Sequence, residues 1–373
     1  MKKRIVITGG HLTPALAVIE ELQKRGGWEI YFFGRKYAAE GEKVPSLESL
    51  IIPEKGIWFI PISAGRLQKK FTRYTIPAAL KIPLGFFQAF FHLLRLRPKV
   101  ILSFGGYVSV PVVVAGWPLG IPAVTHEQTT VAGRATKINS FFAKKICISW
   151  PQTTWMFPKK KSVLTGNPIR QEIFKVNQKL WQALKFEKGR PLILVTGGNQ
   201  GSHAVNLAVE GCLKKILAKY NLFQQTGHLQ ALGDFERLEK ARSKLSPNLQ
   251  RRYHLKKYIF GEEWGTLLSR ADLVVSRAGM NTLTELAALG KPLLLIPHPW
   301  VPKDEQTKNA QMLKEAGLAE ILPQEKLTPR LLFKMIEKMI KNLGFYQSNS
   351  IKAKKLVKLN AASKIADEVE KIS

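Results

Sequence analysis

The chain has 373 residues, which is long for a single hydrophobic core and favours two domains. Its hydrophobic (45%) and charged (23%) fractions are ordinary for a soluble globular protein, and its two cysteines, Cys147 and Cys212, are too far apart in sequence to indicate a disulfide framework or a zinc site. Lysine and arginine (58) outnumber aspartate and glutamate (27), and the net charge of +31 indicates either a polyanionic partner, such as nucleic acid, an anionic membrane or a phosphorylated substrate, or only a general lysine bias.

The first predicted strand ends in a glycine turn. Residues 4–8 (RIVIT) are rich in β-branched side chains and follow the start of the chain without the apolar segment of a signal peptide, so we expect a cytoplasmic protein. Gly9, Gly10 and His11 come next, and a helix is predicted from Pro14. The free N–H groups at a helix amino end suit a phosphate, although two glycines are a weak signal for one. His11 fits either a structural, capping role or catalysis.

Residues 69–99 combine basic, aromatic and apolar side chains. Their spacing predicts an amphipathic helix, whereas Lys81, Gln88 and His92 inside the apolar length argue against a transmembrane span. The helix either is buried in the first domain or lies partly in a membrane interface, with its cations on lipid headgroups. We expect a mixture, in which the carboxyl half packs and the other end contacts lipid through Lys69, Lys70, Arg73, Phe86 and Phe87.

Two later strands of the first half end in residues that suit chemistry. Residues 100–103 lead to Gly105, Gly106 and Tyr107, a second glycine turn before a helix. Residues 122–125 lead to His126 and Glu127, which are candidates for an acid/base pair. Adjacent residues of a strand point to opposite faces, so these two side chains need not act together.

The second half repeats the pattern. Residues 192–196 predict a strand before the glycine-rich turn at 197–201, and residues 273–296 read as strand, turn, helix and strand. Such a βαβ unit places a helix amino end at the carboxyl edge of a parallel sheet. Taken alone, this segment favours a T-x-x-E capping box between Thr282 and Glu285. The alternative is that Glu285 accepts hydrogen bonds from two ribose hydroxyls.

These patterns predict an α/β protein made of two doubly wound, Rossmann-like domains that face each other across a cleft. We expect an N-terminal domain over residues 1–168 and a C-terminal domain over 169–345. Residues 346–373 are predicted as a C-terminal helix that packs back towards the N-terminal domain. A cleft between two such domains would hold a nucleotide and a second substrate.

Five motifs occur in order along nearly the whole chain, and together they are far more specific than any one alone. They are GGYVSVP at 105–111, GIPAVTHEQ at 120–128, GNPIR at 166–170, GGNQGS at 197–202, and RAGMNTLTE with DEQTKNA between 277 and 310. With these motifs the chain resembles the MurG family of glycosyltransferases. The resemblance implies a GT-B fold and an inverting transfer of GlcNAc from UDP-GlcNAc to the C4 hydroxyl of MurNAc in lipid I, undecaprenyl-pyrophosphoryl-MurNAc-pentapeptide. The product would be lipid II for peptidoglycan, and hence for cell wall growth, cell shape and cell division.

The resemblance places the donor mainly on the C-terminal domain. Ile259 would lie near the uracil, residues 280–284 around the diphosphate, and Glu285 on the ribose. Two further pairs are implied, Gln306 and Asn309 on the sugar hydroxyls and Asn199 and Arg170 at the diphosphate. The full expected donor set is Thr8, Gly9, Gly10, Thr129, Arg170, Asn199, Ile259, Met280, Asn281, Thr282, Leu283, Thr284, Glu285, Gln306 and Asn309.

The same resemblance places the acceptor on the N-terminal domain. Its pyrophosphate would lie on the helix amino ends of the two glycine turns, at His11, Gly105, Gly106 and Tyr107. Inverting transfer also needs a base for the acceptor hydroxyl, for which His11 is the first candidate and Glu127 the second. A histidine needs no large pKa shift to act near neutral pH.

No metal and no cofactor is expected. A helix amino end and an arginine can stabilise the negative charge of departing UDP, and the sequence contains no D-x-D pair. The expected partners are therefore UDP-GlcNAc, lipid I and an anionic membrane surface, without nucleic acid. The expected location is peripheral, at the cytoplasmic face of the cell membrane.

The chain departs from the family at three points. A short TGGH follows the first strand where the family usually has a longer GGTGGH, Thr129 replaces a common asparagine, and Asn199 replaces a usual serine. Three alternatives stay open beside the transferase. They are another GT-B enzyme, such as a glycolipid glycosyltransferase or a UDP-GlcNAc 2-epimerase; a non-enzymatic basic protein that binds a polyanion or membrane; and an inactive relative that binds the donor without transfer.

Overall fold

The structure, a computed structural model, describes residues 2–37, 44–65, 75–227 and 232–373. The chain divides into two compact units: unit 1 is Met1–Arg170 with Lys358–Ser373, and unit 2 is Gln171–Val357. The expected membrane contacts Lys69, Lys70 and Arg73 lie outside the described residues. None of the helices in the described ranges has the length and apolar character that crossing a bilayer requires.

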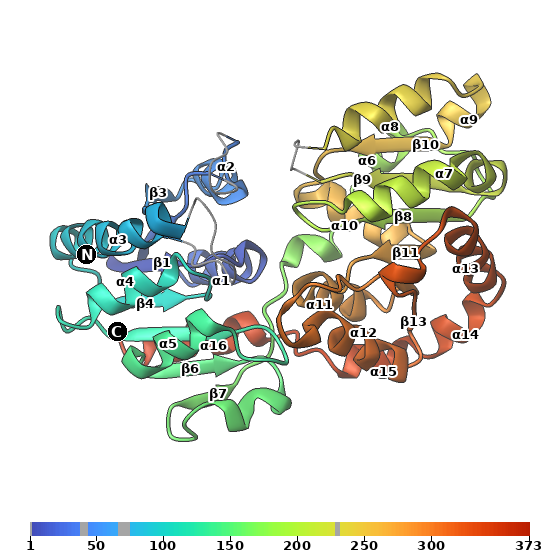
Figure 1. The fold of residues 1–373 in the computed structure, drawn as a ribbon. Helices are drawn as coiled ribbons and strands as arrows, with labels where there is room; N and C mark the ends of the chain where they lie inside the picture. Colours follow the sequence, from blue (N-terminus) through green and yellow to red (C-terminus); the bar gives the residue numbers. More distant parts are fainter. Residues whose placement is uncertain (1, 38–43, 66–74, 228–231) are drawn as a thin grey trace. The chain divides into compact units, whose positions relative to one another are not determined.

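Unit 1 is built on a parallel sheet whose strand order is β3-β2-β1-β4-β5-β6-β7 (Figure 1). The strand order reverses between β1 and β4: the strands that follow β1 are added on one side of it, and the strands that follow β4 are added on the other side. The carboxyl edge at such a switch point is where open α/β sheets bind ligands. The strands are β1 (Lys3–Thr8), β2 (Trp28–Gly34), β3 (Trp58–Pro61), β4 (Val100–Ser103), β5 (Ala123–Glu127), β6 (Lys145–Ile148) and β7 (Ser162–Leu164).

Helices cover this sheet on both faces, which is why β4 and β5 are buried along their whole length. One helix, α16, comes from the far end of the sequence and packs on α1. The helices of unit 1 are α1 (Leu12–Arg25), α2 (Leu47–Glu54), α3 (Thr75–Leu96), α4 (Ser109–Gly116), α5 (Arg134–Phe142), the 3₁₀ helix η1 (Pro151–Met156) and α16 (Ala361–Glu370).

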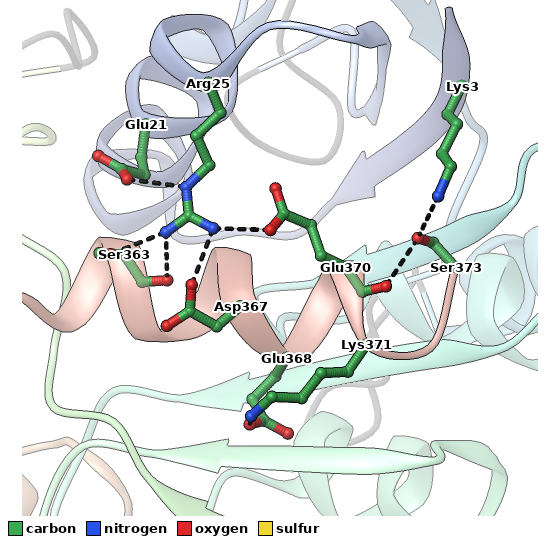
Figure 2. A network of polar contacts seen from close by, with 9 residues as sticks. All are labelled: Lys3, Glu21, Arg25, Ser363, Asp367, Glu368, Glu370, Lys371 and Ser373. Atoms are coloured by element: carbon green, nitrogen blue, oxygen red, sulfur yellow. Dashed lines mark hydrogen bonds and ion pairs between the residues drawn. The ribbon is translucent and has the colours of Figure 1, made fainter.

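Arg25, at the end of α1, holds α16 in place (Figure 2). Its Nη1 lies 2.8 Å from Asp367 Oδ1 and 2.9 Å from Glu370 Oε2, and its Nη2 donates to the carbonyl oxygen of Ser363 at 3.0 Å. Nearby, Lys3 Nζ donates to Ser373 Oγ at 3.3 Å. These contacts join the beginning of the chain to its end within unit 1.

Helix α3 shows a division that the sequence reading placed wrongly. Ala89 and Leu93 are fully buried, and Phe86 and Phe90 pack against the same core. Phe87, by contrast, is 55% exposed. The other apolar side chains on the same face of the helix, Leu84, Phe91 and Leu94, are also exposed. The predicted split, with the carboxyl half packed and Phe86 exposed, is therefore wrong. The division runs between two faces of the helix, because side chains three and four residues apart share a face.

Unit 2 repeats the architecture with a parallel sheet of order β10-β9-β8-β11-β12-β13, and its switch point lies between β8 and β11. Two parallel, doubly wound sheets confirm the predicted α/β class. The predicted cleft between the domains stays a prediction. The strands are β8 (Leu192–Thr196), β9 (Asn221–Gln225), β10 (Tyr253–Lys256), β11 (Leu273–Ser276), β12 (Leu293–Leu295) and β13 (Ala319–Ile321).

The helices of unit 2 include three that carry the candidate site: α7 and α11, which follow glycine turns, and α12. All helices of the unit are η2 (Gln171–Phe174), α6 (Gln178–Ala183), α7 (His203–Lys219), α8 (Asp234–Ser243), α9 (Pro247–Arg251), α10 (Gly261–Arg270), α11 (Met280–Leu289), η3 (Pro302–Asp304), α12 (Glu305–Glu315), η4 (Gln324–Lys326), α13 (Pro329–Lys341), α14 (Leu343–Ser348) and α15 (Ser350–Lys355).

The predicted single helix over residues 346–373 is instead the end of α14 followed by α15 and α16. Of these, α14 and α15 belong to unit 2 and α16 to unit 1. A helix boundary near 357–360 is not visible as a glycine or proline in the sequence, which explains why one helix was expected.

Candidate active site

The two glycine turns of unit 1 touch each other at the switch point. The N–H of Phe104 donates to the carbonyl of Thr8 at 2.7 Å, and the N–H of Gly10 donates to the carbonyl of Gly105 at 2.9 Å. A Cβ atom on Gly106 would lie 2.8 Å from the Gly10 nitrogen, and Gly106 has a φ of +76°. Only glycine fits there, so the paired turns predicted from sequence form one continuous backbone surface at the edge of the sheet.

His11 lies at this surface, directly before α1, and is partly exposed. Desolvation, the larger cause, and the positive charge of Arg35 lower the pKa of His11 to about 4. The ring is therefore neutral near pH 7 and can accept a proton. Tyr107 follows Gly106 at the same edge and is also partly exposed, so His11, Gly105, Gly106 and Tyr107 do come together as expected.

Glu127, the second candidate base, is already engaged. It is 1% exposed; Oε1 accepts from the N–H of Thr129 at 3.1 Å and from its Oγ1 at 2.9 Å, and Oε2 accepts from the N–H of Gly133 at 2.8 Å. The carboxylate and Thr129 thereby fix the loop that leads into α5. Both oxygens of this buried carboxylate are therefore engaged inside the protein and do not face a substrate. His11 is the better candidate on this geometry.

His126 bonds in a different direction from Glu127, as alternation along a strand requires. It is fully buried, and its Nε2 lies 3.0 Å from Ser149 Oγ and 3.2 Å from the carbonyl oxygen of Gly166. Desolvation, the largest cause, lowers the pKa of His126 to about 3. This neutral histidine joins β5 to the loops after β6 and β7, and the two neighbours form no acid/base pair.

In unit 2, α11 begins at Met280 with Gly279 as its N-cap, and no side chain caps it. The capping-box reading of Thr282 and Glu285 is therefore wrong: both residues lie inside the helix. Glu285 is 2% exposed, and its Oε2 accepts from the indole Nε1 of Trp264 at 3.0 Å. The tryptophan orients the carboxylate at the first turns of the helix.

The other residues of α11 divide by burial. Met280 and Leu283 are core side chains, and Thr284 is buried with its Oγ1 donating to the carbonyl of Met280 at 2.8 Å. Asn281 and Thr282 are partly exposed. Consequently Met280 and Leu283 can offer a ligand only their backbone, whereas Asn281 and Thr282 can also offer side chains.

Gln306 and Asn309, one turn apart on α12, hold the turn between β11 and α11. Gln306 Oε1 accepts from the N–H of Ala278 at 3.2 Å and from the N–H of His298 at 2.9 Å. Asn309 is fully buried, and its Nδ2 donates to the carbonyl of Ala278 at 3.1 Å. Both residues therefore lie at the predicted diphosphate turn, and both support its backbone.

Gln225, which was not predicted from the sequence, lies at the end of β9. It connects the loops that follow β8 and β10. Its Nε2 donates to Thr196 Oγ1 at 3.1 Å and to the carbonyl of Gly198 at 2.9 Å, while its Oε1 accepts from the N–H of Ile259 at 3.2 Å. Ile259 is buried, and Asn199 is exposed beside Gly198. The available signal was a pair of glutamines at the end of the apolar run at 222–223.

The expected donor set is divided between the units. Thr8, Gly9, Gly10, Thr129 and Arg170 belong to unit 1, and Arg170 is buried there. The remaining members, from Asn199 to Asn309, belong to unit 2. In the described parts of both units, no group of three or more His, Cys, Asp or Glu side chains is arranged to hold a metal ion.

Sequence reading also missed Arg35 and Glu48 in unit 1. Arg35 follows the last residue of β2, and its Nε donates to Glu48 Oε1 at 2.8 Å. The signal was an arginine immediately after a strand next to β1, at the edge where the glycine turns lie.

Comparison with known proteins gives consistent matches. Residues 7–148 match the glycosyltransferase family 28 N-terminal domain, and residues 192–369 match the glycosyltransferase family 28 C-terminal domain. Two similar curated relatives, from Clostridium kluyveri and Bacillus cereus, are named as UDP-N-acetylglucosamine–N-acetylmuramyl-(pentapeptide) pyrophosphoryl-undecaprenol N-acetylglucosamine transferases, the latter as number 2. Each is 33% identical to this chain; the first covers 99% of both chains, and the second covers 93% of this chain and 94% of the relative.

Solved structures agree on the fold. The crystal structure of Acinetobacter baumannii MurG is 26% identical, with a TM-score of 0.68 over 99% of both chains. UDP-GlcNAc 2-epimerase from Neisseria meningitidis, solved with UDP-GlcNAc bound, has a TM-score of 0.66 over all of both chains at 14% identity, which is a likeness of fold alone.

Proposed function

The chain belongs to glycosyltransferase family 28 and within it to the MurG family, and from this premise we propose that it transfers GlcNAc from UDP-GlcNAc to the C4 hydroxyl of MurNAc in lipid I, forming lipid II. The observation that carries the proposal is the 33% identity, over 99% of both chains, to a relative named for this reaction. The product is a precursor of peptidoglycan.

We propose that unit 2 binds the donor. The amino end of α11, which no side chain caps, presents its partial positive charge to the diphosphate, and the turn that precedes it is fixed by Gln306 and Asn309. Glu285 is oriented by Trp264 to accept hydrogen bonds from the ribose hydroxyls. Among the described residues Gln306 Nε2 has no hydrogen-bond partner, so this amide can donate to the sugar.

In the proposed reaction the C4 hydroxyl oxygen of MurNAc attacks C1 of GlcNAc from the side opposite UDP. The new C–O bond forms as the bond from C1 to the phosphate oxygen breaks, which inverts the anomeric centre. His11, neutral at pH 7, takes the hydroxyl proton, and UDP leaves with the electron pair of the broken bond. The α11 amino end stabilises the charge that develops on UDP.

We also propose that unit 1 binds a membrane surface through the exposed face of α3. That face carries Leu84, Phe87, Phe91 and Leu94, and the whole chain carries a net charge of +31, which suits anionic lipid. Phe87 with Phe91, rather than Phe86, would enter the interface. Co-sedimentation with phosphatidylglycerol vesicles should fall for Phe87→Ser with Phe91→Ser and not for Phe345→Ser, an equally exposed phenylalanine of unit 2.

The test of the activity is an assay of the purified chain with UDP-GlcNAc and a lipid I analogue. The expected result is a disaccharide-bearing lipid II analogue and free UDP in equal amounts. Release of free sugar, or epimerised GlcNAc without transfer to lipid, would favour the epimerase alternative, which shares only the fold at 14% identity. Binding of UDP-GlcNAc without any turnover would favour the inactive relative.

A further inference from the structure

Arg35 stands at the carboxyl edge of the unit 1 sheet on a fixed backbone. It follows Gly34, the last residue of β2, and β2 pairs with β1, the strand that leads to His11. Ser46 Oγ donates to the carbonyl of Arg35 at 2.5 Å, and the same oxygen accepts from the N–H of Ser49 at 3.1 Å as the N-cap of α2. The start of α2 is thereby tied to the end of β2.

The side chain of Arg35 is held by Glu48 and also interacts with the Tyr107 phenol. Its Nε donates to Glu48 Oε1, in the first turn of α2, at 2.8 Å. The Glu48 side chain is 5% exposed and that of Arg35 is 24% exposed, so the carboxylate lies behind the guanidinium and the cation faces outward. The hydrogen bond to Glu48 uses Nε, so the two terminal nitrogens, with four N–H groups between them, retain donors beyond the interaction with Tyr107.

Two residues of the expected acceptor site interact with this guanidinium. Desolvation, the largest cause, lowers the pKa of Arg35, but the negative charge of Glu48 and the Tyr107 phenol outweigh it and the pKa is raised overall. Arg35 is therefore permanently charged. The positive charge of Arg35 also acts on His11, where it is the second cause, after desolvation, of the lowered pKa.

We propose that Arg35 is an anion-binding residue of the acceptor site, which takes a phosphate of the lipid-linked diphosphate on its terminal nitrogens while Glu48 fixes its orientation. This inference rests on the proposed function. A planar guanidinium matches two phosphate oxygens at once, which a point charge does not. The adjoining glycine turns lie at the same edge, directly before the amino ends of α1 and α4, whose partial positive charge also suits a phosphate.

The same placement couples binding to proton transfer. In the free protein the positive charge of Arg35 helps to keep His11 deprotonated, and a bound phosphate would offset that charge. The pKa of His11 then rises when the acceptor binds, so the base becomes stronger where it is needed. The charged and titratable groups around His11 are Arg35, its partners Glu48 and Tyr107, and the neutral His126.

The test replaces the pair rather than Arg35 alone, because a buried Glu48 without its partner would endanger folding. The variant is Arg35→Gln with Glu48→Gln. The control is Arg4→Gln with Glu29→Gln, a more exposed ion pair that is also made through Nε at 2.8 Å and lies at the opposite end of β2, where it joins β1 to β2. Equal thermal midpoints of both variants and the parent establish that the fold is retained.

The first readout is calorimetric binding of farnesyl diphosphate with saturating UDP present to occupy the donor site. We expect about tenfold weaker binding for the Arg35/Glu48 variant and no change for the Arg4/Glu29 control. Arg35→Lys should bind with intermediate affinity, since it keeps the charge and loses the fork. Equal affinity of all four proteins would overturn the proposal.

The second readout is transfer to a lipid I analogue. We expect the Arg35/Glu48 variant to raise the KM for the acceptor about tenfold and to leave the KM for UDP-GlcNAc unchanged. The acid limb of its kcat/KM profile should move to higher pH, because losing the positive charge raises the pKa of His11. An unchanged acceptor KM and pH profile would overturn the inference, whereas a parent protein that binds the diphosphate but transfers nothing would overturn only the proposed function.

Discussion

Units 1 and 2 share one topology but place different kinds of residue at their carboxyl edges. Unit 1 gathers titratable groups there: His11, Arg35 and Glu48. Unit 2 fixes the turn before α11 with the side-chain amides of Gln306 and Asn309, and joins its other exits through Gln225. His11 can change its charge with pH, whereas the amides that fix the turn before α11 cannot. This contrast agrees with the roles proposed above, proton transfer at unit 1 and donor binding at unit 2.

The glycine turns of the two units differ in the same sense. In unit 1 the glycines allow two turns to touch, since Gly106 meets Gly10 across the switch point. In unit 2 the contact lies elsewhere: a Cβ on Gly201 would be 2.1 Å from the carbonyl oxygen of Thr226, so the close approach joins the exits of β8 and β9. Gly279, directly before α11, has open space around it. A ligand can therefore approach the α11 amino end without the backbone having to move.

The largest expected effect is on turnover, and it comes from His11, the proposed base at the carboxyl edge of the unit 1 sheet. His11→Ala should lower kcat by about 10²- to 10⁴-fold with little change in the KM for UDP-GlcNAc, because it removes the base and leaves unit 2 intact. Steady-state transfer to a lipid I analogue measures both. Glu127→Gln is the informative contrast: it should weaken the loop before α5 and lower the thermal midpoint more than kcat. The assignment would be wrong if the Glu127 variant lost turnover and the His11 variant kept it.

The next effect tests the glycine contrast through stability. Gly106→Ala forces a side chain onto a left-handed residue and into the Gly10 nitrogen, and should cost about 2 to 4 kcal/mol of unfolding free energy. Gly279→Ala, at a φ of −72° with nothing within 4 Å, should change the unfolding free energy by less than about 0.5 kcal/mol. Urea denaturation of the two variants measures both values. Equal losses would mean that the two turns are alike after all.

A smaller effect is expected for the donor edge. Glu285→Ala should weaken UDP-GlcNAc binding about 10- to 100-fold, because the ribose loses its acceptor, and should leave acceptor KM unchanged. Trp264→Phe keeps an aromatic side chain but removes the N–H that orients Glu285, so it should produce a milder loss in the same direction. Calorimetric titration with UDP-GlcNAc measures both. An unaffected Trp264 variant would show that the tryptophan does not position the carboxylate.

The smallest expected effect is a loss of stability below neutral pH that comes from two buried or partly buried histidines. The folded-state pKa values of His11 and His126, about 4 and about 3, lie below the ordinary value of 6.5, so both groups bind fewer protons folded than unfolded. Their contribution to stability is complete above pH 6.5 and is lost as the pH falls towards 4. Hydrogen exchange corrected for its intrinsic pH dependence should show β1, β4 and β5 opening more readily at pH 5 than at pH 7. Exchange rates in these strands that are independent of pH would contradict the shifts.

Strand and turn positions were predictable because each is a local property. Residues 4–8, 100–103 and 273–275 carry β-branched or apolar runs, and glycines follow each of them. The Arg35–Glu48 pair was not predictable, because it joins β2 to α2 through the fold. The same holds for the start of α11: Thr282 fits a cap locally, yet the turn held by Gln306 and Asn309 starts the helix at Met280.

Helix α3 shows a second limit of sequence reading. Its apolar residues cover more than one face, so periodicity alone cannot say which face packs. The structure decides through contacts that no spacing reveals. A Cβ on Gly85 would meet the carbonyl of Ser63, and Gln88 Oε1 accepts from the N–H of Ser63 at 2.8 Å. These two residues turn the Phe86 and Leu93 side inward and leave Phe87 and Phe91 outside.

The contact of α16 with α1 has a consequence for biosynthesis. Unit 2 is complete once residue 357 has left the ribosome, whereas unit 1 still lacks the helix that Arg25 binds. The N-terminal unit, although its first residues are made first, thus reaches its finished form after unit 2, and a nascent chain exposes the α1 surface until α16 has been made. A premature stop near residue 358 would damage the opposite end of the gene product, the end that holds His11.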